Sequence, residues 1–215
     1  MSKNFKISIL NLDCGNLSSI YNAFNYLGIN VKIINHETNL LDSEALVIPG
    51  NGNFNYVMNY IKSKNIFDKL QEFCLVKKKP YLGICIGFQI LFSNSLEDNI
   101  STTGLNFIKG SLKPFENKKK ISNFSIPHIG WNSINIKKSN KLFDSAVNSK
   151  LDFYFMHSYI SNDILNPSVT STCEYSEEFI SSVEKENISG IQFHPEKSHD
   201  RGINLLKNWI KSAKN

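Results

Sequence analysis

The sequence predicts an α/β fold: a three-layer open sheet, parallel in its first half and mixed in its second, flanked by helices. Two observations support this prediction. Short apolar runs alternate with segments of helical periodicity in the first half of the chain, which is typical of a parallel sheet. From about residue 105 the apolar runs become shorter and turn residues separate them. Because no repeat, low-complexity tract or change of composition marks a linker, we expect residues 1–215 to form one domain.

The elements of the first half follow from the apolar pattern. Apolar residues at helical spacing between Leu17 and Leu27 predict a helix that ends at Gly28. Strands are predicted at KISILNL (6–12), VKIIN (31–35), ALVIPG (45–50) and YLGIC (81–85), and helices within 54–76 and from about Gly87.

The second half is predicted to consist mainly of strands. They are expected at LNFIKGSL (105–112), HIGWNSINI (128–136), LDFYFMHSYI (151–160), SVTSTC (168–173), FISSV (179–183) and ISGIQFH (188–194). The chain then closes with an amphipathic helix that carries Ile203, Leu206 and Trp209 on its apolar face.

Composition and charge exclude several classes of protein. The chain is 41% hydrophobic and 20% charged, which is ordinary for a globular protein, and no apolar run approaches the roughly 20 residues that span a bilayer. The N-terminal apolar run is too short for a signal peptide, so we expect a cytoplasmic protein. The net charge of +5 is modest, and the lysine runs at 77–79 and 118–120 lack interleaved aromatic residues. We therefore expect neither nucleic acid nor a membrane as partner.

The cysteines favour neither disulfides nor a metal site. Cys14, Cys74, Cys85 and Cys173 are scattered, without a Cys-x-x-Cys pair, which is typical of reduced thiols in a reducing compartment. We expect no metal ion.

One of these cysteines lies where an α/β protein would carry a nucleophile. In Gly83-Ile84-Cys85-Ile86-Gly87 an apolar strand runs into a helix, and the small flanking glycines allow the backbone to double back sharply at the cysteine. The following helix would point free N–H groups at the sulfur, which favours a thiolate. The stretch alone is equally compatible with a buried cysteine in a tight turn.

A cysteine nucleophile needs a base. Among the five histidines only His194 follows a predicted strand and has a carboxylate, Glu196, two residues further on. Glu196 could hold one imidazole nitrogen while the other faces the thiol. A hydrogen-bonded core histidine remains the alternative.

A third element is the turn Pro49-Gly50-Asn51-Gly52 after the strand 45–50. Such a turn places backbone N–H groups at the carboxyl edge of the sheet. One of them, with the N–H of Ile86, could form an oxyanion hole. A plain surface turn with glycines at positive φ is the other interpretation.

Several longer motifs carry a resemblance to a known family. LVIPGNGNF, PYLGICIGFQILF, IPHIGWNSI, YFMHSY and GIQFHPEKS occur in order between residue 6 and about residue 207. Together they resemble the class I (triad) glutamine amidotransferases, and within that family the glutaminase subunits of imidazole glycerol phosphate synthase.

The resemblance implies a set of residue roles in the hydrolysis of glutamine to glutamate and ammonia. Cys85 would attack the side-chain amide, His194 would transfer protons and Glu196 would orient the imidazole. Gly50, Asn51 and Ile86 would form the oxyanion hole. Substrate binding would fall to Gly52, Gln89, Glu97, Ser158 and Tyr159. No cofactor is implied.

The resemblance also implies a partner. Ammonia would pass to a (βα)₈-barrel cyclase subunit of the HisF type, in a heterodimer that serves histidine biosynthesis. Asn16, Trp131 and Lys197 match positions at that interface, although Trp131 is equally compatible with a place in the core.

Three other functions remain open. The chain departs from the family pattern in its first loop (11–17) and at Asn51, where the subunits communicate. It could therefore be a paralogous glutaminase that feeds another amidotransferase, such as one acting on a surface sugar. A catalytically silent regulatory subunit and a stand-alone γ-glutamyl peptide hydrolase are the remaining alternatives.

Overall fold

The first half of the chain alternates strands with helices, as predicted. The computed structural model describes residues 5–116, 125–144, 147–163 and 165–215. The predicted helix within 54–76 is divided in two, because Asn65 adopts a positive φ of 55°. The elements are β1 (Ile7–Leu10), α1 (Leu17–Tyr26), β2 (Val31–Ile34), β3 (Ala45–Ile48), α2 (Phe54–Ser63), α3 (Phe67–Gln71), β4 (Tyr81–Ile84) and α4 (Ile86–Gln89).

The second half contains the remaining strands and one long helix. They are β5 (Asn94–Ser95), β6 (Thr102–Thr103), β7 (Ser111–Pro114), β8 (His128–Ile136), β9 (Lys150–His157), β10 (Tyr159–Ile160), β11 (Val169–Glu174), β12 (Glu178–Lys185), β13 (Ile188–Ile191) and α5 (His199–Ala213). The lysine run at 118–120, which is not expected to bind nucleic acid, lies outside the described residues.

The strand predicted over 105–112 is wrong for most of its length. Only its last two residues belong to a strand, β7. Asn106 and Gly110 have positive φ angles of 58° and 126°, which interrupt an extended conformation. The apolar pattern of this segment instead reflects burial of Leu105, Phe107 and Ile108 against a core.

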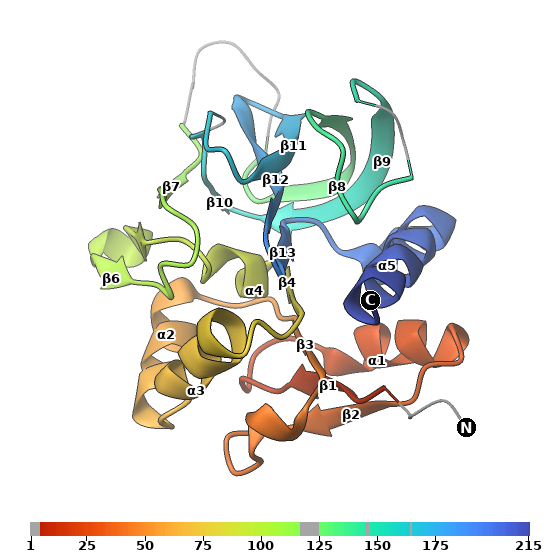
Figure 1. The fold of residues 1–215 in the computed structure, drawn as a ribbon. Coiled ribbons are helices and arrows are strands. Elements are labelled where there is room, and N and C mark those ends of the chain that lie inside the picture. Colours follow the sequence, from red (N-terminus) through yellow and green to blue (C-terminus); the bar gives the residue numbers. More distant parts are fainter. Residues whose placement is uncertain (1–4, 117–124, 145–146, 164) are drawn as a thin grey trace.

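The main sheet confirms the predicted fold class. Among the described residues it has the order β2-β1-β3-β4-β13-β12-β11-β8-β9, and a smaller sheet has the order β10-β7-β5-β6. The strands from β2 to β13 are parallel, whereas those from β13 to β9 pair antiparallel. Helices α1 and α5 cover one face of the parallel part, and α2, α3 and α4 lie on the other (Figure 1).

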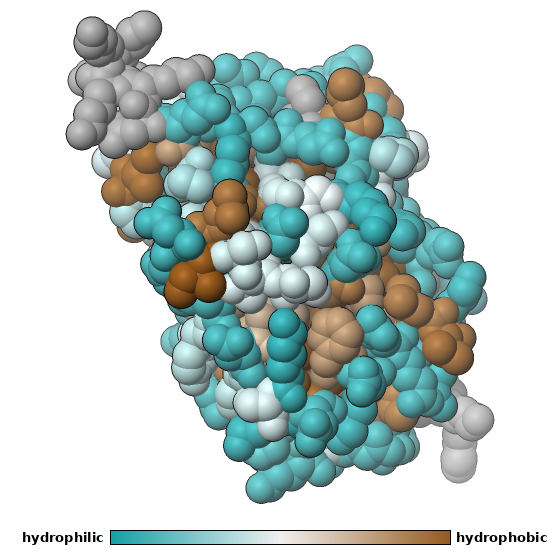
Figure 2. Space-filling model, turned by 90° about the vertical axis from the view of Figure 1, so that its left-hand side faces the viewer, coloured by the Kyte–Doolittle hydropathy of each residue, from teal (hydrophilic) through white to brown (hydrophobic). Residues whose placement is uncertain are grey.

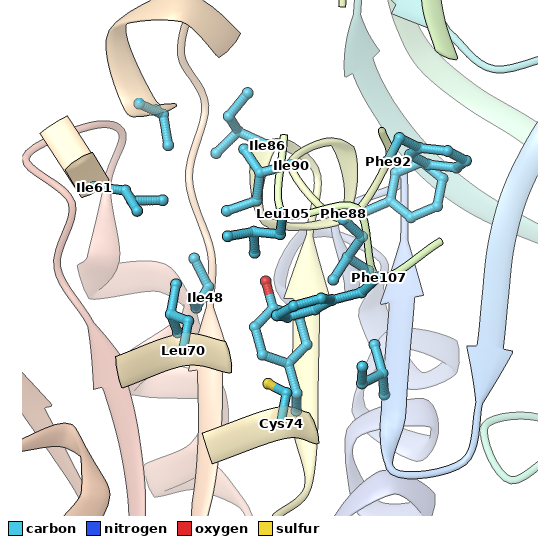
Figure 3. Packing of buried hydrophobic residues seen from close by; sticks show 14 of the residues in the cluster. Ile48, Ile61, Leu70, Cys74, Ile86, Phe88, Ile90, Phe92, Leu105 and Phe107 are labelled. Carbon is cyan, nitrogen blue, oxygen red and sulfur yellow. The ribbon is translucent and has the colours of Figure 1, made fainter. Parts of the chain in front are cut away.

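Side chains that alternate along the parallel strands divide the core into two clusters. In β1, Ile9 packs on the side of α1 and α5, whereas Leu10 packs on the side of α2 and α3. Figure 3 shows the second cluster, in which Ile48, Leu70 and Phe88 converge from β3, α3 and α4. Each such fully buried side chain stabilises the fold by about 1.5–3 kcal/mol. Core packing therefore supports the segment around Cys85, the predicted nucleophile.

The surface over α2 and α3 is mainly hydrophilic. Figure 2 shows hydrophobic residues there in separate patches among hydrophilic ones. None of the helices in the described part of the chain has both the length and the apolar character needed to cross a bilayer.

Candidate active site

The predicted site residues meet at the carboxyl edge of the parallel strands. Strands β4 and β13 are adjacent, with Ile84 opposite Ile191, so the residues that follow them emerge side by side. The N–H of Cys85 donates to the carbonyl of Ile191 at 2.9 Å and fixes this alignment. Strand register is therefore what brings Cys85 close to His194.

Cys85 lies at the tip of a strained turn between β4 and α4. Its backbone angles, φ of 52° and ψ of −104°, lie outside the regions that non-glycine residues normally adopt. The turn closes tightly: a Cβ at Gly83 would lie 2.2 Å from the carbonyl oxygen of Gly87, and one at Gly87 would lie 1.8 Å from that of Ile48. Both glycines are therefore required, and the turn has the geometry of a nucleophile elbow.

His194 and Glu196 form the predicted hydrogen bond. His194 Nδ1 lies 2.7 Å from Glu196 Oε1, and both side chains are almost fully buried. Burial lowers the pKa of His194, but the charges that Cys85 and Glu196 carry when ionised outweigh it and raise the pKa to about 10. His194 Nε2 makes no hydrogen bond with any described residue. It is available to exchange a proton with the sulfur.

The predicted oxyanion hole is not assembled in this conformation. The Ile86 N–H points at the carbonyl oxygen of Gly50, with a nitrogen–oxygen distance of 3.5 Å. A carbonyl thus lies where the oxyanion would need a donor. The turn is closely packed: a Cβ at Gly50 would lie 3.0 Å from Cys14 Sγ.

A cavity of about 310 Å³ opens beside Cys85. All five predicted substrate-binding residues line it. Gln89 is buried, whereas Ser158 and Tyr159 are half-buried. Glu97 also accepts a hydrogen bond from the N–H of Phe54 at 2.5 Å, at the start of α2. The full lining is Asn51, Gly52, Cys85, Gln89, Glu97, Pro127, Ile129, Met156, His157, Ser158 and Tyr159.

A larger hollow of about 450 Å³ lies beside β1 and β2, away from the cysteine. It is lined by residues such as Lys6, Ser8 and Asp42 and holds neither a cysteine nor a histidine. Of these two, only the smaller cavity at Cys85 is lined by a cysteine and a histidine, the residue types that nucleophilic chemistry needs.

Comparison with known proteins agrees with this arrangement of Cys85, His194 and Glu196. Residues 10–213 match the family model described as Glutamine amidotransferase class-I. The chain belongs to this family. It is 39% identical over 213 residues to imidazole glycerol phosphate synthase subunit HisH 2 of Vibrio vulnificus, covering 97% of each chain.

A longer relative and a solved structure extend the comparison. The amidotransferase chain is 34% identical over 206 residues to imidazole glycerol phosphate synthase hisHF of Arabidopsis thaliana, covering 95% of this chain and 34% of that protein. The structure of PurLQS from Thermotoga maritima has the same fold, with a TM-score of 0.74 at 17% identity, and covers 98% of this chain and 99% of that one.

Gln192 is a site residue of this amidotransferase that sequence analysis missed. It is fully buried, and its Nε2 lies 3.7 Å from Cys85 Sγ. Its Oε1 accepts a hydrogen bond of 3.0 Å from Gln89 Nε2. A glutamine within the apolar run GIQF was the available signal, because buried polar side chains need partners.

A second cavity, of about 220 Å³, lies on the other side of the oxyanion turn. His194 and Glu196 line it together with Asn16 and Lys197, two of the predicted interface residues. Asn51 and Met156 line both cavities, and Asn51 Nδ2 contacts Met156 Sδ at 3.7 Å. This pair therefore lies between the cavity at Cys85 and the cavity next to the imidazole. The full lining is Gly15, Asn16, Ser19, Pro49, Gly50, Asn51, Met156, His194, Glu196 and Lys197.

The three predicted interface residues lie at the surface. Asn16 caps α1 by accepting a hydrogen bond of 2.8 Å from the N–H of Ser18. Trp131 is 48% exposed and stacks on His199, so it is not a core residue. Lys197 is exposed, with its ammonium group 5.7 Å from the centre of the Tyr154 ring.

Proposed function

We propose that this chain is the glutaminase subunit of an imidazole glycerol phosphate synthase. It would hydrolyse glutamine with Cys85, His194 and Glu196 and supply ammonia to a (βα)₈-barrel cyclase of the HisF type. The observation that carries the proposal is the Cys85 elbow beside the His194–Glu196 pair, in a chain 39% identical to a HisH subunit over nearly its whole length. None of the comparisons supports the alternative of another acceptor.

The first chemical step follows from the proton positions. Because Glu196 accepts a hydrogen bond from His194 Nδ1, Nε2 is the nitrogen that takes the thiol proton of Cys85, and the raised pKa of His194 favours the resulting imidazolium–thiolate pair. The thiolate then attacks the side-chain carbonyl carbon of glutamine. Nε2 returns the proton to the leaving nitrogen, and ammonia departs from a γ-glutamyl thioester. His194 next activates a water molecule, which releases glutamate.

The negative oxygen formed by this attack needs donors. The amides of Ile86 and of the Gly50–Asn51 turn are the proposed donors, and the turn must first rotate to withdraw the Gly50 carbonyl from Ile86. Glycine at position 50 favours such a rotation, since it lacks a Cβ.

Substrate binding is assigned to the cavity of about 310 Å³ at Cys85. Gly52, Glu97 and the buried Gln89 line it, while Ser158 and Tyr159 would supply backbone groups for the α-carboxylate. The position of Cys85 in the same cavity would place the glutamine side chain against the sulfur.

The partner is proposed to dock beside the second cavity. Asn16 and Lys197 flank that cavity, and Trp131 offers an exposed aromatic side chain of the kind that anchors interfaces. We further propose one domain over residues 1–215, a heterodimer with the cyclase, and action in a reducing cytoplasm, where the free thiols would persist.

The test is reconstitution with a histidine-pathway cyclase barrel. Glutamate release is measured with the chain alone, with the barrel, and with the barrel plus its phosphoribosyl-formimino substrate. We expect stimulation by the liganded barrel and formation of imidazole glycerol phosphate from glutamine. Trp131→Ala should weaken the complex about tenfold or more, and Tyr26→Ala, another exposed aromatic, should not. Glutaminase activity without complex or product would contradict the assignment of the acceptor.

A further inference from the structure

Two buried histidines that the catalytic scheme does not use lie behind the substrate cavity. His128 and His157 face each other across β8 and β9, and their Nδ1 and Nε2 atoms, respectively, are 3.1 Å apart. Both side chains are buried, and burial lowers the pKa of His128 to about 4 and that of His157 to about 3. Both rings are therefore neutral near pH 7, and each carries a single ring proton.

The location of each proton is determined by a neighbouring backbone carbonyl. His157 Nδ1 lies 3.0 Å from the carbonyl oxygen of Tyr159, which can only accept. The His157 proton must be on Nδ1, and its Nε2 is then an acceptor. His128 must therefore donate from its own Nδ1, which leaves its Nε2 as an acceptor.

Asn132 satisfies this last acceptor. Its Nδ2 lies 3.3 Å from His128 Nε2 and also donates to the carbonyl of Glu174 at 2.9 Å. Its Oδ1 accepts from the N–H of Ser133 at 2.8 Å, so the orientation of the amide is fixed. One arrangement of protons thus satisfies the whole chain from Asn132 to Tyr159.

The same carbonyl connects the histidines to the substrate cavity. The Tyr159 oxygen also accepts a hydrogen bond of 3.2 Å from Gln89 Nε2, and the second Nε2 hydrogen goes to Gln192 Oε1 at 3.0 Å. The Gln89 side chain is therefore held with both donors occupied. Within the described part of the chain its Oε1 has no hydrogen-bond donor, and Gln89 lines the cavity.

We propose that His128 and His157 are positioning residues for glutamine: protonated on Nδ1, they fix the Tyr159 carbonyl, and thereby hold Gln89 with its Oε1 facing the substrate. An amide oxygen at this place accepts a hydrogen bond from the α-ammonium group of glutamine. It disfavours binding of a ligand that would place a second carboxylate, beside the α-carboxylate, at the same position. The inference rests on the proposed glutaminase function, because it concerns the same cavity.

The first test compares two variants of equal size at position 128. In His128→Asn the side-chain NH₂ replaces Nδ1 and still donates to His157. His128→Leu leaves the buried His157 acceptor unpaired. We expect the leucine variant to raise the KM for glutamine about tenfold with kcat within about twofold, and the asparagine variant to stay near wild type. Assays use the complex with the cyclase, after thermal unfolding has shown that both variants fold.

The substrate analogue without an α-amino group sharpens this test. For 4-carbamoylbutanoate the KM should be high in the wild type and unchanged in His128→Leu. Equal KM values for glutamine in the two variants, or a loss confined to kcat, would overturn the proposal. Wild-type glutaminase activity, measured in the same series, tests the underlying function separately.

The second test does not depend on activity. Nitrogen-15 NMR of histidine-labelled wild-type protein near pH 7 reports which ring nitrogen carries the proton. Both His128 and His157 should be neutral and protonated on Nδ1. A His157 ring that is cationic, or protonated on Nε2, would contradict the hydrogen-bond polarity on which the proposal depends.

Discussion

The N–H of Ile86 points at the carbonyl oxygen of Gly50, 3.5 Å away. In this conformation the amide proposed as an oxyanion donor already has an acceptor. The proposed oxyanion hole is therefore closed, and the proposed mechanism requires the turn to rotate before the Ile86 N–H can donate to the substrate.

Gly50→Ala should displace the turn that is proposed to supply an oxyanion donor. The added Cβ would lie 2.7 Å from Ile86 Cγ2 and 3.0 Å from Cys14 Sγ, so it crowds the observed conformation of the turn. We expect kcat for glutamine hydrolysis to fall about 10²–10³-fold, the effect of losing one oxyanion donor. Steady-state kinetics measures it, with thermal unfolding as a check on folding. An unchanged kcat would show that the turn supplies no oxyanion donor.

Cys85→Ala should lower kcat for glutamine hydrolysis by about 10³-fold or more. The γ-glutamyl thioester, detected by mass spectrometry after acid quenching, should disappear with it. Cys173→Ala is the matched control, because Cys173 is a buried free thiol of β11 in the core. Normal glutamine turnover by the assembled complex with the Cys85 variant would instead support the silent-subunit alternative.

Glu196→Gln should change the pH profile as well as the rate. The carboxylate helps to raise the pKa of His194 to about 10, so the imidazolium that accompanies a thiolate persists into alkaline solution. Without that charge the His194 pKa falls. We expect the alkaline limb of kcat/KM to move to lower pH and kcat to fall about 10²-fold. A profile identical to wild type would mean that Glu196 acts only structurally.

The buried histidine pair should make the fold sensitive to mild acid. Burial lowers the pKa of His128 to about 4 and that of His157 to about 3, from 6.5. Below pH 6.5 the unfolded chain therefore binds protons that the folded chain does not, and stability is lost progressively down to about pH 3–4. Urea unfolding at about pH 7.5 and about pH 5 should show this loss, and His128→Asn should reduce it.

Gly87→Ala should destabilise the protein strongly. Its Cβ would lie 1.8 Å from the carbonyl oxygen of Ile48, which belongs to a buried strand and cannot move aside. We expect a loss of several kcal/mol or failure to fold. Gly28→Ala is the control: it has a positive φ but open space, so it should cost only about 1–2 kcal/mol. Similar losses in both variants would rule out crowding as the cause.

Most of the fold followed from sequence because the elements near the site have strong local signals. The apolar run before Cys85 and the alternating residues of His128–Ile136 predicted their strands within a residue or two. The strand predicted over 105–112 was wrong, because burial against a core and pairing in a sheet produce the same apolar pattern.

For the site, sequence motifs indicated Cys85, His194 and Glu196. Each belongs to a short motif whose residue types the proposed chemistry requires. The motifs did not indicate Gln192, the histidine pair or the state of the oxyanion turn. Those depend on which polar groups become buried together and on where each carbonyl points.

By itself, then, the sequence determined the α/β fold and the family, and it indicated the residues proposed as nucleophile, base and oxyanion turn, because each is encoded within a short stretch of chain. Only the tertiary structure decided that Ile86 is engaged by Gly50 and that one set of protons connects Asn132 to Gln89. Hydrogen-bond polarity is a property of groups brought together from β8, β9 and α4, and no single segment of the sequence specifies it.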